Sequence, residues 1–206
     1  MRVNINLWII FLFISTIGLG QISGDSIIQE NIEYRTNLNA HYSDSAHSPL
    51  KGKDLKEFDS LPFFPIDTSY YIIAKFVKIK KGKTFKMKTS TARKPVYKVY
   101  GKAVFTIGDT TYELMIYQNV ALTKREGFED FLFLPFNDFT NGNETYGGGR
   151  YLDLRIPKGD SIVIDFNKAY NPYCAYTDGY SCPVPPRENG LKTYIKAGVK
   201  FEGEEH

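Results

Sequence analysis

The sequence predicts a mainly β protein: an antiparallel barrel or sandwich of about eight strands, with one N-terminal helix packed outside it. Three observations carry this prediction. Apolar and polar residues alternate with a period of two in several short segments after Tyr70, which is typical of strands with one buried face. Turn sequences separate these segments, and one segment near the amino terminus has helical spacing instead. A hydrophobic content of 42% and an aromatic content of 15% indicate a packed core rather than disorder.

Residues 1–20 have the pattern of a cleavable secretory signal peptide. Arg2 supplies a positive charge, and the apolar run from Leu7 to Leu19 is shorter than the roughly 20 residues that span a bilayer. The small Gly20 suits signal peptidase. We therefore expect an exported protein, periplasmic or secreted, in which residues 21–206 form a single β-rich domain with no membrane span after signal cleavage.

The helix is expected first along the mature chain. Ser26 and Gln29 have the spacing of a capping box, in which side chains satisfy the free amides of the first turn. The helix is expected to end near His41. Its apolar stripe is formed by Ile28, Ile32, Leu38 and Tyr42.

The strands follow. Along the segment from Tyr97 to Ile107 the alternation predicts one buried face, and Gly108-Asp109 then predicts a tight hairpin into the next strand. One further strand is expected to begin near Tyr70. The others are expected at residues 85–89, 112–116, 131–134, 151–156, 160–166 and 191–199.

One hairpin can be given a register from its turn. Pro157-Lys158-Gly159 suits a three-residue loop, since proline fixes φ and glycine takes the left-handed position. This register pairs Leu154 with Ile162 and Leu152 with Ile164 on an apolar face. On the polar face it places Tyr151 opposite Asp165, with Asp153 diagonal to it.

The basic residues are unevenly distributed. The whole chain has a net charge of +3, yet no acidic residue stands between Asp67 and Asp109, where there are eleven cations. This basic segment, Lys75 to Lys102, could meet an anionic glycan or lipid headgroups. Alternatively, its lysines protect exposed strand edges from pairing or neutralise acids elsewhere in the fold. Nucleic acid is not an expected partner of an exported protein.

Two segments, 144–151 and 165–189, are dense in aromatic and hydrogen-bonding side chains. Three glycines precede Arg150, which allows close approach of the backbone or a flexible turn. We expect a small molecule or glycan to bind there, with rings for stacking and polar groups for orientation, unless the segments are purely structural. The candidate ligand-binding residues are Glu144, Tyr146, Arg150, Tyr151, Asp153, Asp165, Asn167, Tyr170, Asn171 and Asn189.

The alternative function is a hydrolase that uses Asp153, Asp165 or Glu144 as general acid and base. No Gly-x-Ser-x-Gly motif is present, so a serine nucleophile has no support. No catalytic residue can be assigned, and no cofactor is expected.

Cys174 and Cys182 are the two cysteines of the chain. In an oxidising compartment a disulfide between them is the expected state. A metal site is the alternative, but the histidines of the mature chain lack paired metal-ligand spacing, so no metal is expected.

Several motifs extend over nearly the whole mature chain. They are HSPL at 47–50, LPFFP at 61–65, PFND at 135–138, ETYG at 144–147, GRYL at 149–152, DFN at 165–167, AYNP at 169–172, CAY at 174–176, CP at 182–183, PP at 185–186 and AG at 197–198. Together they resemble the DUF1684 family. The resemblance implies no settled activity, but it implies that these polar segments are the shared feature of the fold. Val199 stands where the family usually has an acidic residue.

Overall fold

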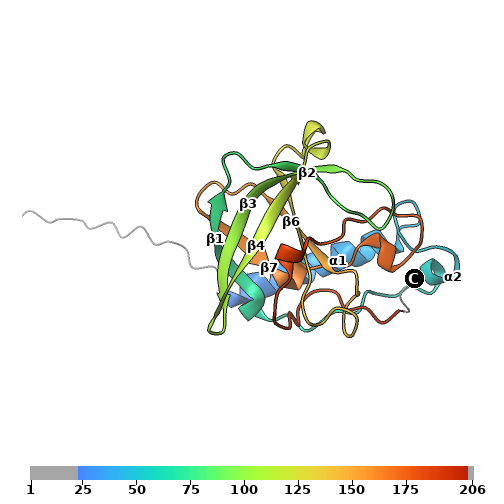
Figure 1. Cartoon of the computed structure of the whole chain (residues 1–206). Coiled ribbons are helices and arrows are strands. Elements are labelled where there is room, and N and C mark those ends of the chain that lie inside the picture. The colour runs from blue at the N-terminus through green and yellow to red at the C-terminus, as the bar shows by residue number, and fades with distance from the viewer. Residues whose placement is uncertain (1–22, 204–206) are drawn as a thin grey trace, which may run out of the picture.

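The computed structural model describes residues 23–203, and the expected signal peptide at 1–20 lies outside the described residues. Seven antiparallel strands form one sheet that curls into a half-barrel, with a single long helix beside it (Figure 1). The mainly β prediction with one N-terminal helix is therefore confirmed. Within the described residues, no helix is both long and apolar enough to cross a bilayer.

The helices are α1 (Gly24–Ser43) and α2 (Gly52–Lys56), and five short 3-10 turns lie outside the sheet. The strands are β1 (Tyr71–Lys78), β2 (Thr84–Lys86), β3 (Val96–Ile107), β4 (Thr110–Asn119), β5 (Phe131–Phe136), β6 (Arg150–Arg155) and β7 (Ser161–Asp165). Their order across the sheet is β6-β5-β4-β3-β1-β7, and β2 pairs with β3. The expected strand at 191–199 does not form: that segment has no ladder and makes only an isolated bridge between Phe63 and Val199.

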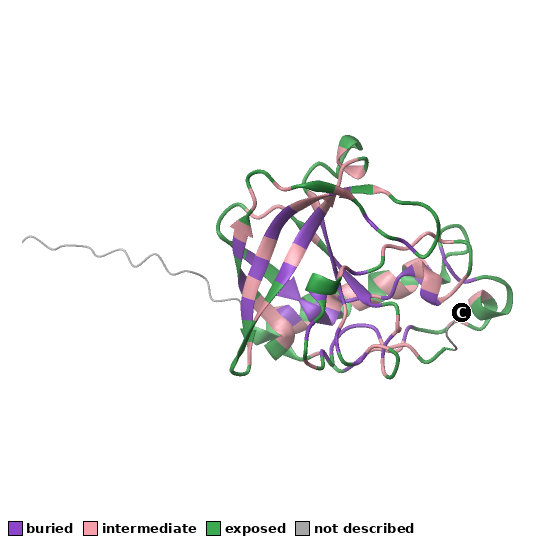
Figure 2. Cartoon of the chain, viewed as in Figure 1, coloured by how far each residue is buried: buried purple, intermediate pink, exposed green. Residues whose placement is uncertain are grey.

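The long β3–β4 hairpin is the centre of the sheet, and its Gly108-Asp109 turn is confirmed by the pairing of Ile107 with Thr110. Gly108 has a φ of +56°, the left-handed conformation that such a turn requires. Figure 2 shows bands of alternating burial along both strands, as a period of two predicts.

A β-bulge between Val99 and Gly101 divides β3 into two halves with opposite facing. Tyr97 therefore points away from the main core that contains Phe105, whereas simple alternation predicted one face for both. Gly101 is required at the bulge because a Cβ there would lie 2.6 Å from the ring of Phe76. Bulges increase the local twist of a strand, which favours the curl of the sheet.

The predicted β6–β7 hairpin register is wrong. β6 pairs with β5 and β7 pairs with β1, so the two strands are opposite edges of the half-barrel. Asp165 accordingly lies opposite Tyr71 rather than Tyr151. Leu152 and Ile164 still share the main core, because the curl brings the inner faces of both edges together. Alternation predicts which face a residue occupies, but it does not predict the partner strand.

α1 begins one turn earlier than predicted, because Ser23 and not Ser26 caps it by accepting a hydrogen bond from the Ser26 amide. The predicted stripe is also displaced, since Ile32 is 45% exposed. Tyr42 is buried as predicted, but the other buried residues of the helix are Ile27 and Asn31. A polar residue in the buried face is the reason why the apolar pattern alone misplaced it.

Candidate functional site

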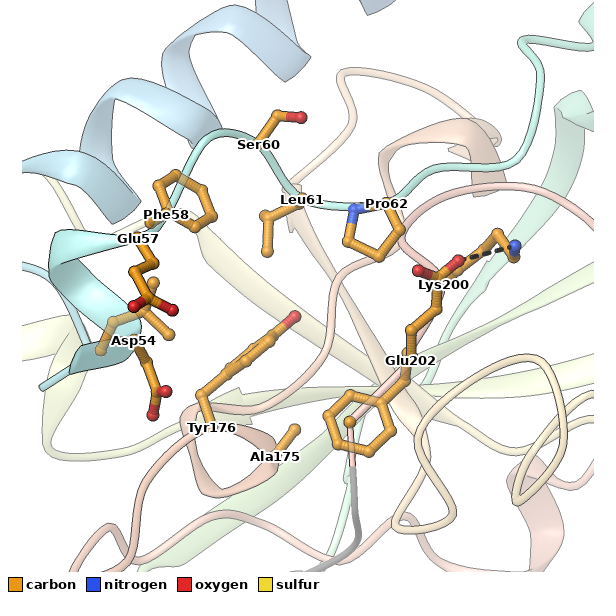
Figure 3. Close-up of a pocket in the computed structure, with 13 residues that line it drawn as sticks. Asp54, Glu57, Phe58, Ser60, Leu61, Pro62, Ala175, Tyr176, Lys200 and Glu202 are labelled. Carbon is orange, nitrogen blue, oxygen red and sulfur yellow. Dashed lines mark hydrogen bonds and ion pairs between the residues drawn. The ribbon is translucent and has the colours of Figure 1, made fainter.

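Cavities of about 490, 590 and 360 Å³ open in the described part of the chain, and the smallest lies where β3 begins and β4 ends. One, of about 490 Å³, lies between α2 and the segment that leads to Gly203 (Figure 3). Phe58, Leu61 and Tyr176 form apolar walls, while burial raises the pKa of Tyr176 to about 12. None of the residues predicted from the sequence as a ligand site lines this cavity.

A second cavity, of about 590 Å³, lies beside α1 and the outer face of β5 and β6, and it is here called the aromatic pocket. Three of the predicted site residues, Tyr151, Asp153 and Tyr170, line it. Its full lining is Tyr34, Leu38, Tyr42, Arg93, Tyr97, Phe131, Phe133, Tyr151, Asp153, Tyr170, Pro172, Tyr173, Tyr180, Ser181, Cys182 and Pro183.

The alternation of β5 and β6 explains how the rings reach the pocket. Leu132 and Leu152 point into the main core, so their neighbours Phe133 and Tyr151 point to the opposite face. The Phe133 and Tyr151 rings pack edge to face with centroids 4.8 Å apart. Tyr97 joins them from β3, 5.8 Å from Phe133, because the bulge turns it to this side.

Tyr170 reaches the pocket because its backbone pairs with the free edge of β6. The Tyr170 amide donates to the Tyr151 carbonyl at 3.1 Å, and the Tyr151 amide donates to the Tyr170 carbonyl at 2.9 Å. The two rings are then nearly perpendicular, at 88°. The Tyr170 hydroxyl donates a 2.7 Å hydrogen bond to Oδ1 of Asp153.

Among residues 23–203, Asp153 is the only acidic residue that lines the aromatic pocket, and it is open to solvent through the pocket. The surrounding protein raises the pKa of its carboxyl by removing hydration, and the Tyr170 hydroxyl and the charge of Arg155 lower it in part. Arg155 itself pairs with Asp130 at 2.7 Å. Among residues 23–203, no cation lies within ion-pair distance of Asp153.

Three tyrosines of the pocket, Tyr97, Tyr151 and Tyr170, stay neutral at physiological pH. Burial raises the pKa of Tyr97, Tyr151 and Tyr170, since the charged phenolate is the form that loses hydration. The positive charge of Arg93 lowers the pKa of Tyr97 in part, and the negative charge of Asp153 raises it. The pocket therefore offers ring surfaces and neutral hydroxyls, with one anion and one cation.

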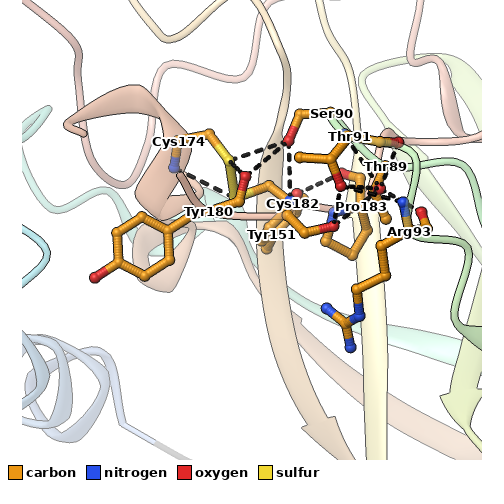
Figure 4. The surroundings of a disulfide bond; sticks show 10 residues. Thr89, Ser90, Thr91, Arg93, Tyr151, Cys174, Tyr180, Cys182 and Pro183 are labelled. Atoms are coloured by element: carbon orange, nitrogen blue, oxygen red, sulfur yellow. Dashed lines mark hydrogen bonds between the residues drawn. A yellow bond between two sulfur atoms is a disulfide. The ribbon is translucent and has the colours of Figure 1, made fainter. Parts of the chain in front are cut away.

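The Cys174–Cys182 disulfide closes one wall of the aromatic pocket, which confirms the predicted pairing (Figure 4). The Cα atoms of the two cysteines are 6.3 Å apart. Ser90 anchors this wall: its amide donates to the Cys182 carbonyl at 2.9 Å, and its hydroxyl accepts from the Cys182 amide at 3.1 Å. The Tyr151 hydroxyl donates to the Pro183 carbonyl and joins the wall to β6.

The other predicted site residues lie outside the aromatic pocket. Arg150 is fully buried, with its guanidinium 2.7 Å from Asp138 and 2.8 Å from the Ile195 carbonyl. Burial lowers the pKa of Arg150, and Asp138 raises it in part. Arg150 also donates to the Ala197 carbonyl. Arg150 thus fixes the 191–199 segment to the rest of the fold. This segment has the alternation of a strand but forms no β ladder.

Asp165 and Asn167 join distant segments of the chain. The Asn167 amide group accepts from the Asp67 amide at 3.0 Å and donates to the Asp67 carbonyl at 2.8 Å. Asp165, 5% exposed, accepts a 2.8 Å hydrogen bond from Asn31 of α1. The carboxylate therefore fixes the helix to the end of β7.

Asn189 and Asn171 are also fully buried. Asn189 accepts from the Met115 amide at 2.8 Å and donates to the Met115 and Pro135 carbonyls at 2.8 and 2.7 Å. It bridges β4 and β5, which pair directly only at Tyr117 and Phe133. Asn171 donates to the Tyr176 hydroxyl at 3.1 Å and to the Lys200 carbonyl at 3.0 Å.

The 144–151 loop packs on its own chain. Glu144 pairs with Lys196 at 3.2 Å, and the Tyr146 ring packs edge to face on Phe201. Gly149 has a φ of +91°, and a Cβ there would lie 2.9 Å from the carbonyl oxygen of Phe136. Gly149 is thus needed for close packing of the backbone. The three consecutive glycines had indicated either such close packing or a flexible turn.

The basic segment lies on β1 to β3 and their connections. Lys102 pairs with Glu113 at 2.6 Å, and across residues 23–203 the other ten cations form no ion pair. β2 carries Lys86 and is paired on one side only, as the edge-protection interpretation requires. No cluster of His, Cys, Asp and Glu that could hold a metal ion occurs among the described residues.

Most rings of the aromatic pocket were missed by sequence reasoning. Tyr34 and Tyr42 come from α1, Tyr97 from β3, and Tyr173 and Tyr180 from the disulfide segment. No motif or spacing joins these positions. Tyr173 and Tyr180 lie in the segment 165–189 in which a site was expected. For the rings on α1 and β3 the only signal was compositional, because the chain has 15 tyrosines and 15 phenylalanines.

Comparison with known proteins supplies a family and a fold. A family model described as "Protein of unknown function (DUF1684)" matches residues 56–200. The solution NMR structure of an uncharacterized protein from Haloarcula marismortui is similar, with 30% sequence identity and a TM-score of 0.69, and the match covers 87% of this chain and 97% of that chain. A search of curated proteins finds no match. The family match begins after α1, so the part of the pocket formed by Tyr34, Leu38 and Tyr42 lies outside it.

Proposed function

The chain belongs to the DUF1684 family, and from the geometry of the aromatic pocket we propose that it is a binding module for a small organic molecule or a glycan unit. One observation carries the proposal: in the part of the chain that the structure describes, nine aromatic rings and only two charged side chains line a cavity of about 590 Å³. Small-molecule sites are typically concave, mostly apolar and aromatic, with a few polar groups that orient the ligand. In this pocket those groups are Asp153, Arg93 and the tyrosine hydroxyls.

Binding is favoured over the alternative of a carboxylate-dependent hydrolase. Hydrolysis of a glycosidic bond typically uses two carboxylates at one substrate. Of Asp153, Asp165 and Glu144, only Asp153 lines the aromatic pocket, while Asp165 is occupied by hydrogen bonds and Glu144 pairs with Lys196. A single carboxylate can orient a bound ligand, but it does not supply the pair of carboxylates that such hydrolysis uses.

Export of the protein is part of the same proposal. The signal pattern of residues 1–20 and the Cys174–Cys182 disulfide both support an oxidising compartment. Intact mass of protein from the exported fraction is expected to give a chain that begins at Gln21 with both cysteines oxidised. An uncleaved chain, or two free thiols, would contradict export.

The binding function is tested by thermal shift with neutral glycans, organic cations and small organic anions. At least one class is expected to raise the melting temperature of the wild-type protein. Tyr180→Ala removes a ring of the pocket wall and should abolish the shift. Tyr194→Ala, at an exposed ring outside the pocket, is the matched control and should keep it. Absence of any shift across the three classes, or an equal shift in Tyr180→Ala, refutes the proposal.

A further inference from the structure

We infer that the aromatic pocket takes an organic cation, with an ammonium group placed between the Asp153 carboxylate and the surrounding rings. The inference rests on the proposed binding function and names the chemical class of its ligand. It depends on the charge of Asp153, the arrangement of nearby cations and the chemistry of the pocket walls.

Asp153 lacks a cationic partner although one stands nearby on the same strand. Arg155 is two positions along β6 and faces the same side, but its Nη1 binds Asp130 and the Gly127 carbonyl, each at 2.7 Å. Its charge lowers the pKa of Asp153 only in part. The carboxylate is therefore left to be neutralised by something from outside the chain.

Tyr170 holds this carboxylate in place without neutralising it. The hydroxyl donates to Oδ1 at 2.7 Å, and no hydrogen bond within residues 23–203 is made to Oδ2. Loss of hydration raises the pKa of Asp153, so its carboxylate is less well stabilised here than in water, and a positive charge beside it offsets that cost. A bound ammonium ion supplies that charge, whereas a neutral hydroxyl does not.

The walls around Asp153 favour the same ligand. Tyr and Phe rings carry a negative face that attracts ammonium groups, and aromatic cages recognise quaternary ammonium ions in this way. The Tyr97, Tyr151 and Tyr170 hydroxyls stay protonated, so the rings add no competing anion. Asp153 is thus the single anionic group toward which a cation in this pocket is drawn.

Arg93 is the one cation on the lining, and it limits where the ammonium group can lie. Its charge acts on the Tyr97 hydroxyl, but among residues 23–203 it forms no ion pair with Asp153. In Figure 4 its side chain extends away from the hydrogen bonds around the disulfide. The ammonium group therefore lies on the Asp153 side of Tyr97, and an acceptor on the ligand suits the Arg93 side.

The test compares a cation with its neutral isostere. Choline chloride and 3,3-dimethyl-1-butanol have the same shape, but only choline is charged. Calorimetric titration of the oxidised protein is expected to show choline binding at least about tenfold tighter than the alcohol. Asp153→Asn keeps an acceptor for Tyr170 and should weaken choline at least about tenfold while leaving the alcohol unchanged.

The control variant is Asp109→Asn, which removes the same charge at the exposed β3–β4 turn and should bind choline like the wild type. Equal affinity for choline and the alcohol, or an Asp153→Asn variant that binds choline normally, overturns the inference. If instead a neutral glycan or an anion binds and Tyr180→Ala abolishes that binding, the cation inference fails while the proposed binding function stands. If no compound binds at all, both fail.

Discussion

Removal of the Cys174–Cys182 disulfide tests how one wall of the aromatic pocket is stabilised. The bridge joins positions separated by 8 in the sequence, and the loss of chain entropy on closing so short a loop corresponds to about 2.5 kcal/mol at 25 °C. For a protein of this size, that difference lowers the melting temperature by about 5–10 °C. The hydrogen bonds from Ser90 remain, so the rest of the wall is expected to keep its fold.

Differential scanning calorimetry of a Cys174→Ser, Cys182→Ser double variant measures this difference. Reductant is expected to bring the wild-type protein to the melting temperature of the double variant and to leave the variant unchanged. A melting temperature within about 2 °C of the wild type would refute the chain-entropy argument. A loss far above 2.5 kcal/mol would refute the expectation that the wall keeps its fold without the bridge.

The remaining predictions concern the buried polar residues and Asp153. Arg150→Met leaves Asp138 buried without its cation and should cost about 3–5 kcal/mol by urea unfolding, whereas Lys196→Met at an exposed pair should cost less than about 1. Equal costs would contradict the structural role of Arg150. Asn189→Ala leaves the half-buried Met115 amide and carbonyl and the buried Pro135 carbonyl unpaired and should cost at least about 3 kcal/mol; a smaller loss would show that β4 and β5 do not depend on it. Because folding raises the pKa of Asp153, its ionisation opposes folding above the unfolded pKa of about 3.9. Asp153→Asn should therefore raise the melting temperature at pH 7, and the gain should shrink as the pH falls toward about 4; a gain independent of pH would contradict the shift.

The strands could be predicted because alternation is a local property. Tyr151 and Asp153 were correctly placed together on the face of β6 opposite Leu152. The partner strand could not be predicted, since the apolar faces of β6 and β7 fit either a hairpin or the two edges of a curled sheet. The bulge at Gly101 was hidden for a related reason, because one inserted residue reverses the facing of Tyr97 without changing the composition of the strand.

The candidate site could be predicted only in part. Arg150, Asp165, Asn167 and Asn189 are polar residues in unusual segments, which is also the pattern of residues that satisfy buried backbone groups. Sequence does not separate these two uses, because both require the same hydrogen-bonding side chains. The rings of the aromatic pocket were hidden because they meet only through the tertiary fold, as in the approach of Tyr34 on α1 to the outer face of β6.

The measurement that tests the central claim most directly is a map of amide and side-chain NMR shifts during titration with choline chloride. The largest changes are expected at Tyr151, Asp153, Tyr170 and residues 180–183 of the pocket wall, and they should be lost in Asp153→Asn. Changes confined to the cavity beside α2 or to the basic segment would contradict the assignment of the aromatic pocket as the ligand site.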